Sequence, residues 1–329
     1  MGASAKFIDA VSRTGALDVS LKMKRSPPVI LMYHGVTAAR PAAGPVANCE
    51  GKHLALDIFA EHLRILRRTR RVVPLHEMVE GLARGEARDN EVALTFDDGY
   101  ENNATVAAPL LADFRMPAAF FLTTGLVGTA EAIWTDKVEM AFDRTAKTTL
   151  HLRATDETLP LHTPQERRQA MLRTKAVLKR LPTPDFHHAF ATILHALGDP
   201  DTAPSGDYRF MSWDQARAMS DAGFEMGAHT VTHPILSRMP FEQAAHEMLS
   251  SRDRVTQETG ACSSTFCFPN GKSSDYTQEL LDLCQQHFKA ALSTERGPAL
   301  PGELLTLRRL SPSGAGRGEN IQWMLLRAR

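Results

Sequence analysis

The sequence has few cysteines, and their arrangement excludes two common uses of that residue. It contains four in 329 residues, and no two of them form the Cys-x-x-Cys pair found in zinc knuckles and redox motifs. The four are Cys49, Cys262, Cys267 and Cys284. So sparse a set does not predict a disulfide framework, and it fits a reducing compartment.

Net charge and long apolar runs are lacking as well. The 38 basic residues balance the 38 acidic ones, so no nucleic-acid partner is expected. No run of about 18 apolar residues could cross a bilayer. The N-terminal region mixes both signs of charge and lacks the apolar core of a signal peptide, which favours the cytoplasm. Residues 5–22 have the pattern of an amphipathic helix that would dock on the rest of the protein or, alternatively, on a membrane surface.

One apolar strand runs directly into two carboxylates and a glycine. Val92–Phe96 has the composition of a short buried β-strand, Asp97–Gly99 follows it, and residues 100–114 have the apolar spacing of a helix. In folds that alternate strands and helices, ligands bind at the carboxyl ends of the strands. The two adjacent aspartates would point to opposite faces and take different roles, although Asp and Gly also form ordinary turns.

A second apolar strand ends in a pair of histidines. His229 and His233 follow residues 224–228 with three residues between them. A histidine pair together with a carboxylate from elsewhere has the composition of a catalytic metal site, where three protein ligands leave one position open. Pro234 argues against the continuous helix that carries both histidines in His-Glu-x-x-His zinc proteases. The pair is therefore expected on a strand end and its loop.

Three motifs stand in the order of a known enzyme family. Thr95–Gly99 reads Thr-Phe-Asp-Asp-Gly, His229–His233 reads His-Thr-x-x-His, and Phe268–Gly271 follows them. With these motifs, and with the spacing of strands over about residues 28–125 and 211–311, the chain resembles the polysaccharide deacetylases of carbohydrate esterase family 4. The resemblance implies an α/β fold, a distorted (β/α) barrel of seven or eight strands, and a metal-dependent activity that removes N- or O-linked acetyl groups.

These residue types suggest how a metal would be held and used. Asp98, His229 and His233 would bind a divalent cation; zinc is expected from this ligand set, and cobalt, nickel or manganese fit the same geometry. The cation would lower the pKa of a bound water from 15.7 toward about 7. The resemblance assigns Asp98 as metal ligand and Asp97 as general base. The backbone N–H of Tyr100 is the expected donor to the oxyanion.

The motif that carries the general acid in this family is incomplete here. The family ends with Leu-x-Leu-x-His, but Leu305–Leu307 is followed by Arg308 and Arg309. Loss of such an acid would cost about 10²–10⁴-fold in rate. His34 is the candidate replacement, because it ends the strand 29–33 and barrel closure brings the first strand beside the last. The alternative is that His34 only packs at the end of its strand.

The third motif also departs from the family pattern. Cys267 lies two residues before Pro269, where the family commonly has an arginine that positions the catalytic aspartate. Arg308 or Arg309 would supply the missing guanidinium, and Arg308 is counted among the expected substrate or oxyanion contacts. A cysteine within a strand is usually an inert small hydrophobe, so Cys267 is not expected to be a nucleophile. Asn270 is expected to shape the loop near the sugar.

The chain is expected to have three parts. Residues 1–27 would form a helical extension and residues 28–329 the barrel. Between about 128 and 210 the chain is several times longer than a crossover requires, and its pattern predicts helices punctuated by prolines. This insertion on the catalytic rim would be a lid or an acceptor-binding subdomain, with Trp134 as a stacking residue, or else a packing or oligomer contact. Three of its histidines are expected only on its surface or in its packing: His187, His188 and His195.

Four functions are compatible with these motifs. The first is a metal-dependent hydrolase that removes acetyl groups, above all N-acetyl groups, from a sugar in a polysaccharide, glycolipid or precursor glycan. The second keeps the site but hydrolyses an O-acetyl ester on a glycan. The third is a carbohydrate-binding pseudoenzyme, which the two broken motifs would allow. A structural or interaction protein would need neither the carboxylates nor the histidines, and the sequence favours it least.

Overall fold

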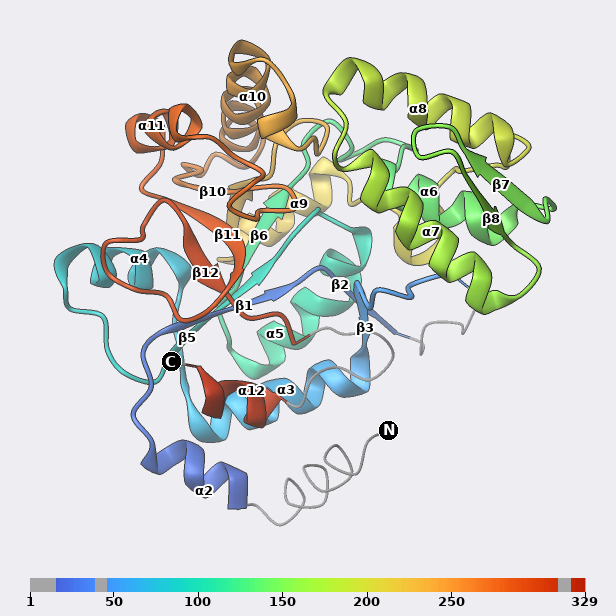
Figure 1. The fold of residues 1–329 in the computed structure, drawn as a ribbon. Helices are drawn as coiled ribbons and strands as arrows, with labels where there is room; N and C mark the ends of the chain where they lie inside the picture. Colours follow the sequence, from blue (N-terminus) through green and yellow to red (C-terminus); the bar gives the residue numbers. More distant parts are fainter. Residues whose placement is uncertain (1–15, 39–45, 313–320, 329) are drawn as a thin grey trace.

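The computed structural model describes residues 16–38, 46–312 and 321–328. Its centre is a nearly closed barrel of parallel strands in the order β1-β5-β6-β9-β10-β11-β12 (Figure 1). These are β1 (Val29–Tyr33), β5 (Glu91–Phe96), β6 (Ala119–Leu122), β9 (Glu225–Ala228), β10 (Thr265–Cys267), β11 (Ala290–Arg296) and β12 (Leu307–Arg309), while β4 (Arg71–Val72) pairs with β5 outside this ring. The ring closes where Met32 N–H donates to Leu310 O and Leu310 N–H donates to Ile30 O, each at 2.9 Å. The predicted barrel of seven or eight strands is confirmed.

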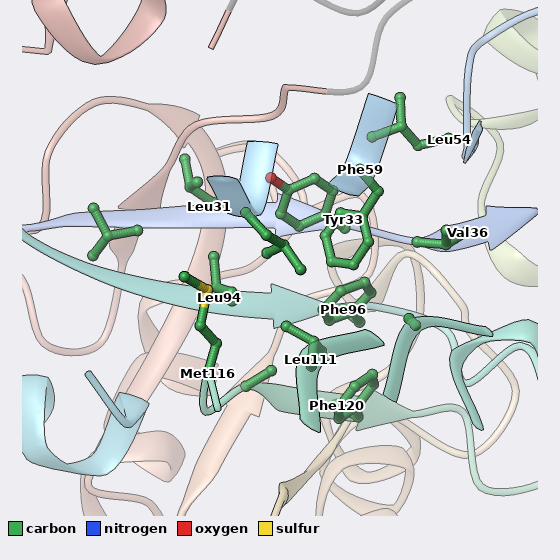
Figure 2. Close-up of a cluster of buried hydrophobic side chains, with 14 of the residues drawn as sticks. Leu31, Tyr33, Val36, Leu54, Phe59, Leu94, Phe96, Leu111, Met116 and Phe120 are labelled. Atoms are coloured by element: carbon green, nitrogen blue, oxygen red, sulfur yellow. The ribbon is translucent and has the colours of Figure 1, made fainter. Parts of the chain in front are cut away.

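Strand β5 runs through the middle of the core and carries the aspartate pair at its end. All of its residues are buried, as expected for a parallel strand covered on both faces. The ring of Phe96 stacks between two others, with centroids 5.3 Å from Tyr33 of β1 and 4.7 Å from Phe120 of β6 (Figure 2). Phe59 meets both Tyr33 and Phe96 edge-on. This packing of large rings fixes the carboxyl end of β5.

Helices cover the barrel and connect its strands (Figure 1). They are α3 (Leu56–Thr69), α4 (Leu75–Arg84), α5 (Ala108–Phe114), α9 (Trp213–Asp221), α10 (Phe241–Thr259) and α11 (Gln278–His287). A π-helical turn, η1 (Asn103–Ala107), precedes α5 in the region where the sequence predicts one continuous helix. Such turns are frequent at functional sites, and this one follows the aspartate pair closely. A 3₁₀ turn, η3 (Leu236–Arg238), follows the histidine loop.

The segment between β6 and α9 forms a group of elements beside the small sheet of β2 (Gly35–Thr37) and β3 (His53–Ala55) (Figure 1). Its elements are α6 (Trp134–Arg144), β7 (Thr149–Leu152), β8 (Glu157–Pro160), α7 (Pro164–Leu178), α8 (Thr183–Ala196) and the 3₁₀ turn η2 (Gly206–Tyr208). Apolar side chains such as Phe142 and Met171 give it a buried cluster of its own. The helices lie where the sequence predicts them, but the hairpin β7-β8 is not predicted. Its signal is Asp156, whose left-handed backbone (φ 53°) suits a tight turn.

The helices nearest the two ends of the chain pack together. Helix α2 (Ala16–Met23) buries Leu17 and Leu21 and contacts both α3 and α12 (Ile321–Arg327) (Figure 1). The C-terminal part of the predicted amphipathic helix over residues 5–22 therefore docks on the barrel through its apolar side chains, and residues 5–15 lie outside the described residues. Among the described ranges, no helix combines the length and the apolar character needed to cross a membrane.

Candidate metal and catalytic site

The site is built at the carboxyl ends of β5 and β9. Asp97 and Asp98 directly follow β5, and His229 directly follows β9. Asp98 adopts a left-handed backbone (φ 78°) and Gly99 follows at φ 92°, so the chain reverses direction there. His233 is left-handed too, with φ 61°. Such conformations cost energy in residues other than glycine, and they cluster at functional sites.

Three buried ligand atoms converge within 4.8 Å of one another, and two of their three separations match a tetrahedral metal site. Oδ1 of Asp98 lies 3.4 Å from Nε2 of His229 and 3.3 Å from Nε2 of His233. Tetrahedral ligands bound to zinc at about 2.0–2.1 Å stand about 3.3–3.4 Å apart. This buried oxygen also has no hydrogen-bond partner among the described residues. The three residues therefore fit a divalent cation.

Hydrogen bonds and burial prepare these ligands for a metal. The contact of His229 Nδ1 with the carbonyl oxygen of Cys267, at 2.7 Å, requires the proton on Nδ1 and directs Nε2 toward Asp98. Burial would raise the pKa of Asp98, but the two imidazoles hold it well below its usual range, so the carboxylate is ionised. Burial lowers the pKa of His233, against the effect of Asp98, and this favours a neutral imidazole.

One glutamate anchors the histidine loop. Oε2 of Glu247, on α10, accepts from the N–H of Val231 at 2.7 Å and of Thr232 at 2.8 Å, and Oε1 accepts from the hydroxyl of Thr232 at 2.7 Å. The N–H of His233 donates to Thr230 Oγ1 at 3.0 Å. These bonds hold the imidazoles in place before any ligand binds, and supporting contacts of this kind are what tune metal sites. No motif in the sequence points to Glu247.

Asp97 meets Arg309 of β12. Nη1 and Nη2 of the guanidinium donate to Oδ1 and Oδ2 at 2.7 Å each. The other donors of this buried side chain go to Ser293 O, Thr95 Oγ1 and Cys267 Sγ, so every guanidinium N–H has a partner. Burial alone would raise the pKa of Asp97, but the ion pair with Arg309 holds it below its usual range.

The two candidate arginines face different surroundings. Arg308 donates to Glu303 Oε1 at 2.8 Å and its side chain is 43% exposed, whereas Arg309 is buried against Asp97. Neighbours on a strand point to opposite faces, which explains the difference. Arg309 therefore supplies the guanidinium that Cys267 does not. A substrate contact of Arg308 stays a prediction.

A second group of possible metal ligands is already occupied by the guanidinium of Arg309. Ligand atoms of Asp97, His229 and Cys267 lie within 4.8 Å of one another. The guanidinium of Arg309 contacts both carboxylate oxygens and the sulfur, and its positive charge would repel a cation there. Burial raises the pKa of the Cys267 thiol, which stays protonated and is a poor nucleophile.

His34 follows β1 at the same mouth of the barrel. Tyr33 pairs with Phe96, so His34 and Asp97 follow neighbouring strands at the same level of the barrel. Burial lowers the pKa of His34, against the effect of the carboxylates of Asp98 and Asp97. Its Nδ1 is buried and has no hydrogen-bond partner among the described residues. The structure thus brings His34 to the predicted base and metal ligand, and its role as the acid stays a prediction.

The backbone around Tyr100 leaves its N–H available. The two hydrogen bonds that flank it run from Glu101 N–H to Arg209 O and from Met211 N–H to Gly99 O. Neither bond uses the N–H of Tyr100 itself. This donor lies on the turn that begins with Asp98, and its role as the oxyanion donor stays a prediction.

The side chain of Tyr100 is held by a network that the sequence analysis missed. Its hydroxyl donates to Oδ2 of Asp136 at 2.7 Å. Lys52 forms an ion pair with the other oxygen of Asp136 and also donates to the Tyr100 hydroxyl at 3.3 Å and to Thr135 Oγ1 at 3.1 Å. Burial would lower the pKa of Lys52, but Asp136 and Asp98 hold it above its usual range, so the ammonium is charged. No motif or spacing relates Lys52 to Asp136, because they come from separate segments.

The two remaining predicted residues lie in different places. Asn270 has a left-handed backbone (φ 57°) in the loop after β10, and its buried Nδ2 has no partner among the described residues. Trp134 is half-buried in the insertion, with its ring 5.2 Å from that of Phe186. Contacts of Asn270 and Trp134 with a sugar stay predictions.

Comparison with protein families agrees with this site. The model of a family described as polysaccharide deacetylase matches residues 84–288, more than half of the chain, and the matched part contains Asp97, Asp98, His229 and His233. The chain belongs to the polysaccharide deacetylase family. No curated protein sequence matches it significantly.

Several solved deacetylase structures are similar to this member of the family. The deacetylase PplD of Streptococcus pyogenes, in complex with acetate, has 19% identity and a TM-score of 0.60, over 92% of this chain and 99% of that one. IcaB from Ammonifex degensii has 16% identity and a TM-score of 0.57, over 92% and 97%. A de-N-acetylase from Aggregatibacter actinomycetemcomitans has 15% identity and a TM-score of 0.54, over 92% and 100%. At these identities the likeness shows the shared fold.

Proposed function

We propose that the protein is a metal-dependent deacetylase that removes N-acetyl groups from a sugar of a polysaccharide, glycolipid or precursor glycan. The observation that carries this proposal is the convergence of Asp98, His229 and His233 beside the buried pair of Asp97 and Arg309. Family membership supports the substrate class. Zinc is the proposed metal, because two imidazoles and one carboxylate at tetrahedral spacing suit it.

Each residue would have one task in the hydrolysis. A bound divalent cation supplies Lewis-acid polarisation of the acetyl carbonyl and a lowered pKa for water. Asp97, kept ionised by Arg309, would take a proton from the attacking water through a lone pair that Arg309 does not use. The N–H of Tyr100 would donate to the oxyanion, a contribution typically of about 3 kcal/mol. His34 would give a proton to the departing amine.

The same contacts weigh against a pseudoenzyme. That hypothesis rests on the missing histidine of the last motif and the missing arginine of the third motif. Arg309 restores the guanidinium at Asp97, and His34 brings an imidazole to the same mouth of the barrel. A protein that only binds carbohydrate would not need a base with a tuned pKa.

Acetate release is the direct test. The substrates are N-acetylglucosamine oligomers, acetylated glycolipids and O-acetylated sugar esters, offered to protein that has been stripped of metal and then reloaded with zinc or cobalt. We expect release from the N-acetyl substrates that a chelator abolishes and zinc restores. Asp97→Asn should lower kcat by about 10²–10⁴-fold, since it removes the base.

A control variant and three further outcomes separate the alternatives. Asp113→Asn, a change at an exposed aspartate of α5, is the matched control and should keep full activity. Release from the esters alone would make the protein an O-acetyl esterase. Tight zinc binding without release from any substrate, or an Asp97→Asn variant as active as the parent, would contradict the proposal.

A further inference from the structure

A cavity with several polar side chains in its walls lies between the loop before β3 and the insertion. Its volume is about 220 Å³. Its walls include His53 of β3, Asp143 of α6, and Asp207 and Tyr208 of η2. None of these side chains has a task in the metal centre or in the proton transfers described above. The cavity is therefore a separate candidate site.

His53 connects this cavity to the reaction centre. A Cβ on Gly35, the residue after His34, would lie 2.0 Å from His53 Nδ1. The imidazole therefore packs directly on the backbone beside the proposed acid. Its ring centroid lies 4.7 Å from that of Tyr100 and 5.3 Å from that of Tyr208. His53 therefore lies between the cavity and the ring of Tyr100, whose backbone N–H is the proposed oxyanion donor.

His53 holds a hydrogen-bond donor without an acceptor. The residue is 2% exposed, and burial lowers its pKa to about 4, so the ring is neutral at pH 7. Nδ2 of Asn102 lies 3.1 Å from His53 Nδ1 and 3.3 Å from Asp207 Oδ1. An amide nitrogen between these atoms donates to both, which leaves the ring proton on Nε2. Nε2 is buried and has no partner among the described residues, and a buried polar group of this kind requires one.

Two carboxylates of the cavity have acceptor capacity to spare. Oδ1 of Asp143 is buried and has no partner among the described residues. Asp207 accepts from Asn102 at 3.3 Å, which uses one of the lone pairs of its carboxylate. Glu139, in the same wall, already accepts from three donors. The wall also contains Arg144, so its three carboxylates and one guanidinium leave a net negative charge, which disfavours an anion. An N–H donor beside carboxylate acceptors matches sugar hydroxyls, which both donate and accept.

We propose that this cavity binds the sugar unit next to the reacting one in the glycan. The proposal rests on the proposed function for the identity of the reacting unit, while the contacts themselves require only a sugar. Asp143 and Asp207 both belong to the insertion, so this part of the chain would recognise the glycan. A single acetylated sugar cannot fill the catalytic site and the cavity together. Oligomers should therefore bind more tightly than N-acetylglucosamine.

Calorimetry on the full chain tests the site. The parent carries Asp97→Asn to prevent turnover, and Asp143→Asn or Asp207→Asn is added to it. Asp156→Asn is the matched control, because that carboxylate is 96% exposed at the tip of the hairpin in the same insertion and asparagine tolerates its left-handed backbone. The probes are N-acetylglucosamine and its trimers joined by β-1,4 or β-1,6 bonds. Each cavity variant should weaken binding of the better trimer about tenfold, with the monosaccharide unaffected and the control equal to the parent.

The outcomes separate this proposal from the proposed activity. Equal trimer affinities in all variants, an equal loss for the monosaccharide, or no binding of either trimer would overturn the cavity as a sugar site. Acetate release is measured on the chain with its native Asp97. Trimer binding that depends on Asp143 and Asp207, but without acetate release, would support the sugar site and contradict the deacetylase. Acetate release, together with trimer binding that is unaffected by the Asp143 and Asp207 changes, would support the deacetylase and contradict the sugar site.

Discussion

One residue, Arg309, accounts for both departures from the family motifs. It stands at the position where the final Leu-x-Leu-x-His motif has its histidine, counted from Leu305 and Leu307. Its guanidinium reaches Asp97 and Cys267, where the third motif would otherwise bring an arginine. The planar fork makes two parallel bonds to one carboxylate, a geometry that lysine cannot reproduce.

Arg309→Lys should therefore affect the chemical step more than binding. Lysine keeps the charge, but it leaves one oxygen of Asp97 and the other acceptors without partners. We expect kcat for acetate release to fall about 10–100-fold, as for other residues that orient a reacting group, with KM little changed. Arg64→Lys, at an arginine of α3 whose side chain is 50% exposed, is the control and should keep parental kcat. A kcat equal to the parent's in Arg309→Lys would show that Asp97 is positioned without the fork.

At the scale of helices and loops, buried charged side chains connect the insertion to the turn that carries Tyr100. Asp136 of α6 holds the hydroxyl of Tyr100 and the ammonium of Lys52, and its side chain is fully buried. Removing one partner of such a pair leaves the other charge buried and uncompensated. The insertion thus supports the turn that carries the proposed oxyanion donor.

Asp136→Ala should lower the free energy of unfolding by about 3–5 kcal/mol, as is typical for a broken buried ion pair, and urea denaturation would measure it. Glu131→Ala breaks the exposed pair with Lys137 and should cost only about 0–1 kcal/mol. The remaining folded Asp136→Ala protein should bind zinc normally but release acetate more slowly, since Tyr100 loses its support. Parental stability and parental rates together would rule out this support.

For the whole molecule, acid should weaken the fold through a histidine that lies outside the motifs. His62 of α3 is buried beside the hydroxyl of Tyr33, and burial lowers its pKa to about 4 from the ordinary 6.5. The unfolded chain therefore takes up this proton first, and stability falls as the pH drops from 6.5 to 4. By linkage, the loss between pH 7 and pH 5 is about 2 kcal/mol. In urea unfolding experiments over the same pH interval, His62→Gln should lose about 2 kcal/mol less stability than the parent. Equal pH dependence of the two proteins would contradict the assignment.

The sequence predicted the parts of the site that lie close together in the chain. The segment His229–His233 brings two expected ligands together on one loop, so a local pattern was enough to place them beside each other. Arg308 and Arg309 could not be distinguished, because a shift of one residue in a strand exchanges its faces, and β12 pairs with β11 through a register shift. The link between Lys52 and Asp136 could not be predicted either, since it depends on how the insertion packs. A residue pattern predicts single helices and strands from their periodicity. Contacts between distant segments depend on how the whole chain packs, so the pattern does not predict them.

Because β1 pairs with the chain just beyond β12, the site depends on residues that are synthesised far apart in time. On the ribosome His34 emerges early, and Arg309 emerges only when most of the chain has been made. Until then β1 lacks the pairing in which Met32 and Ile30 bond to Leu310, and the carboxylate of Asp97 lacks the guanidinium of Arg309. A nascent chain, or one cut before Arg309, would carry all three motifs and still lack the guanidinium that holds Asp97. Completion of β12 is thus the step at which the ion pair of Asp97 and Arg309 can form.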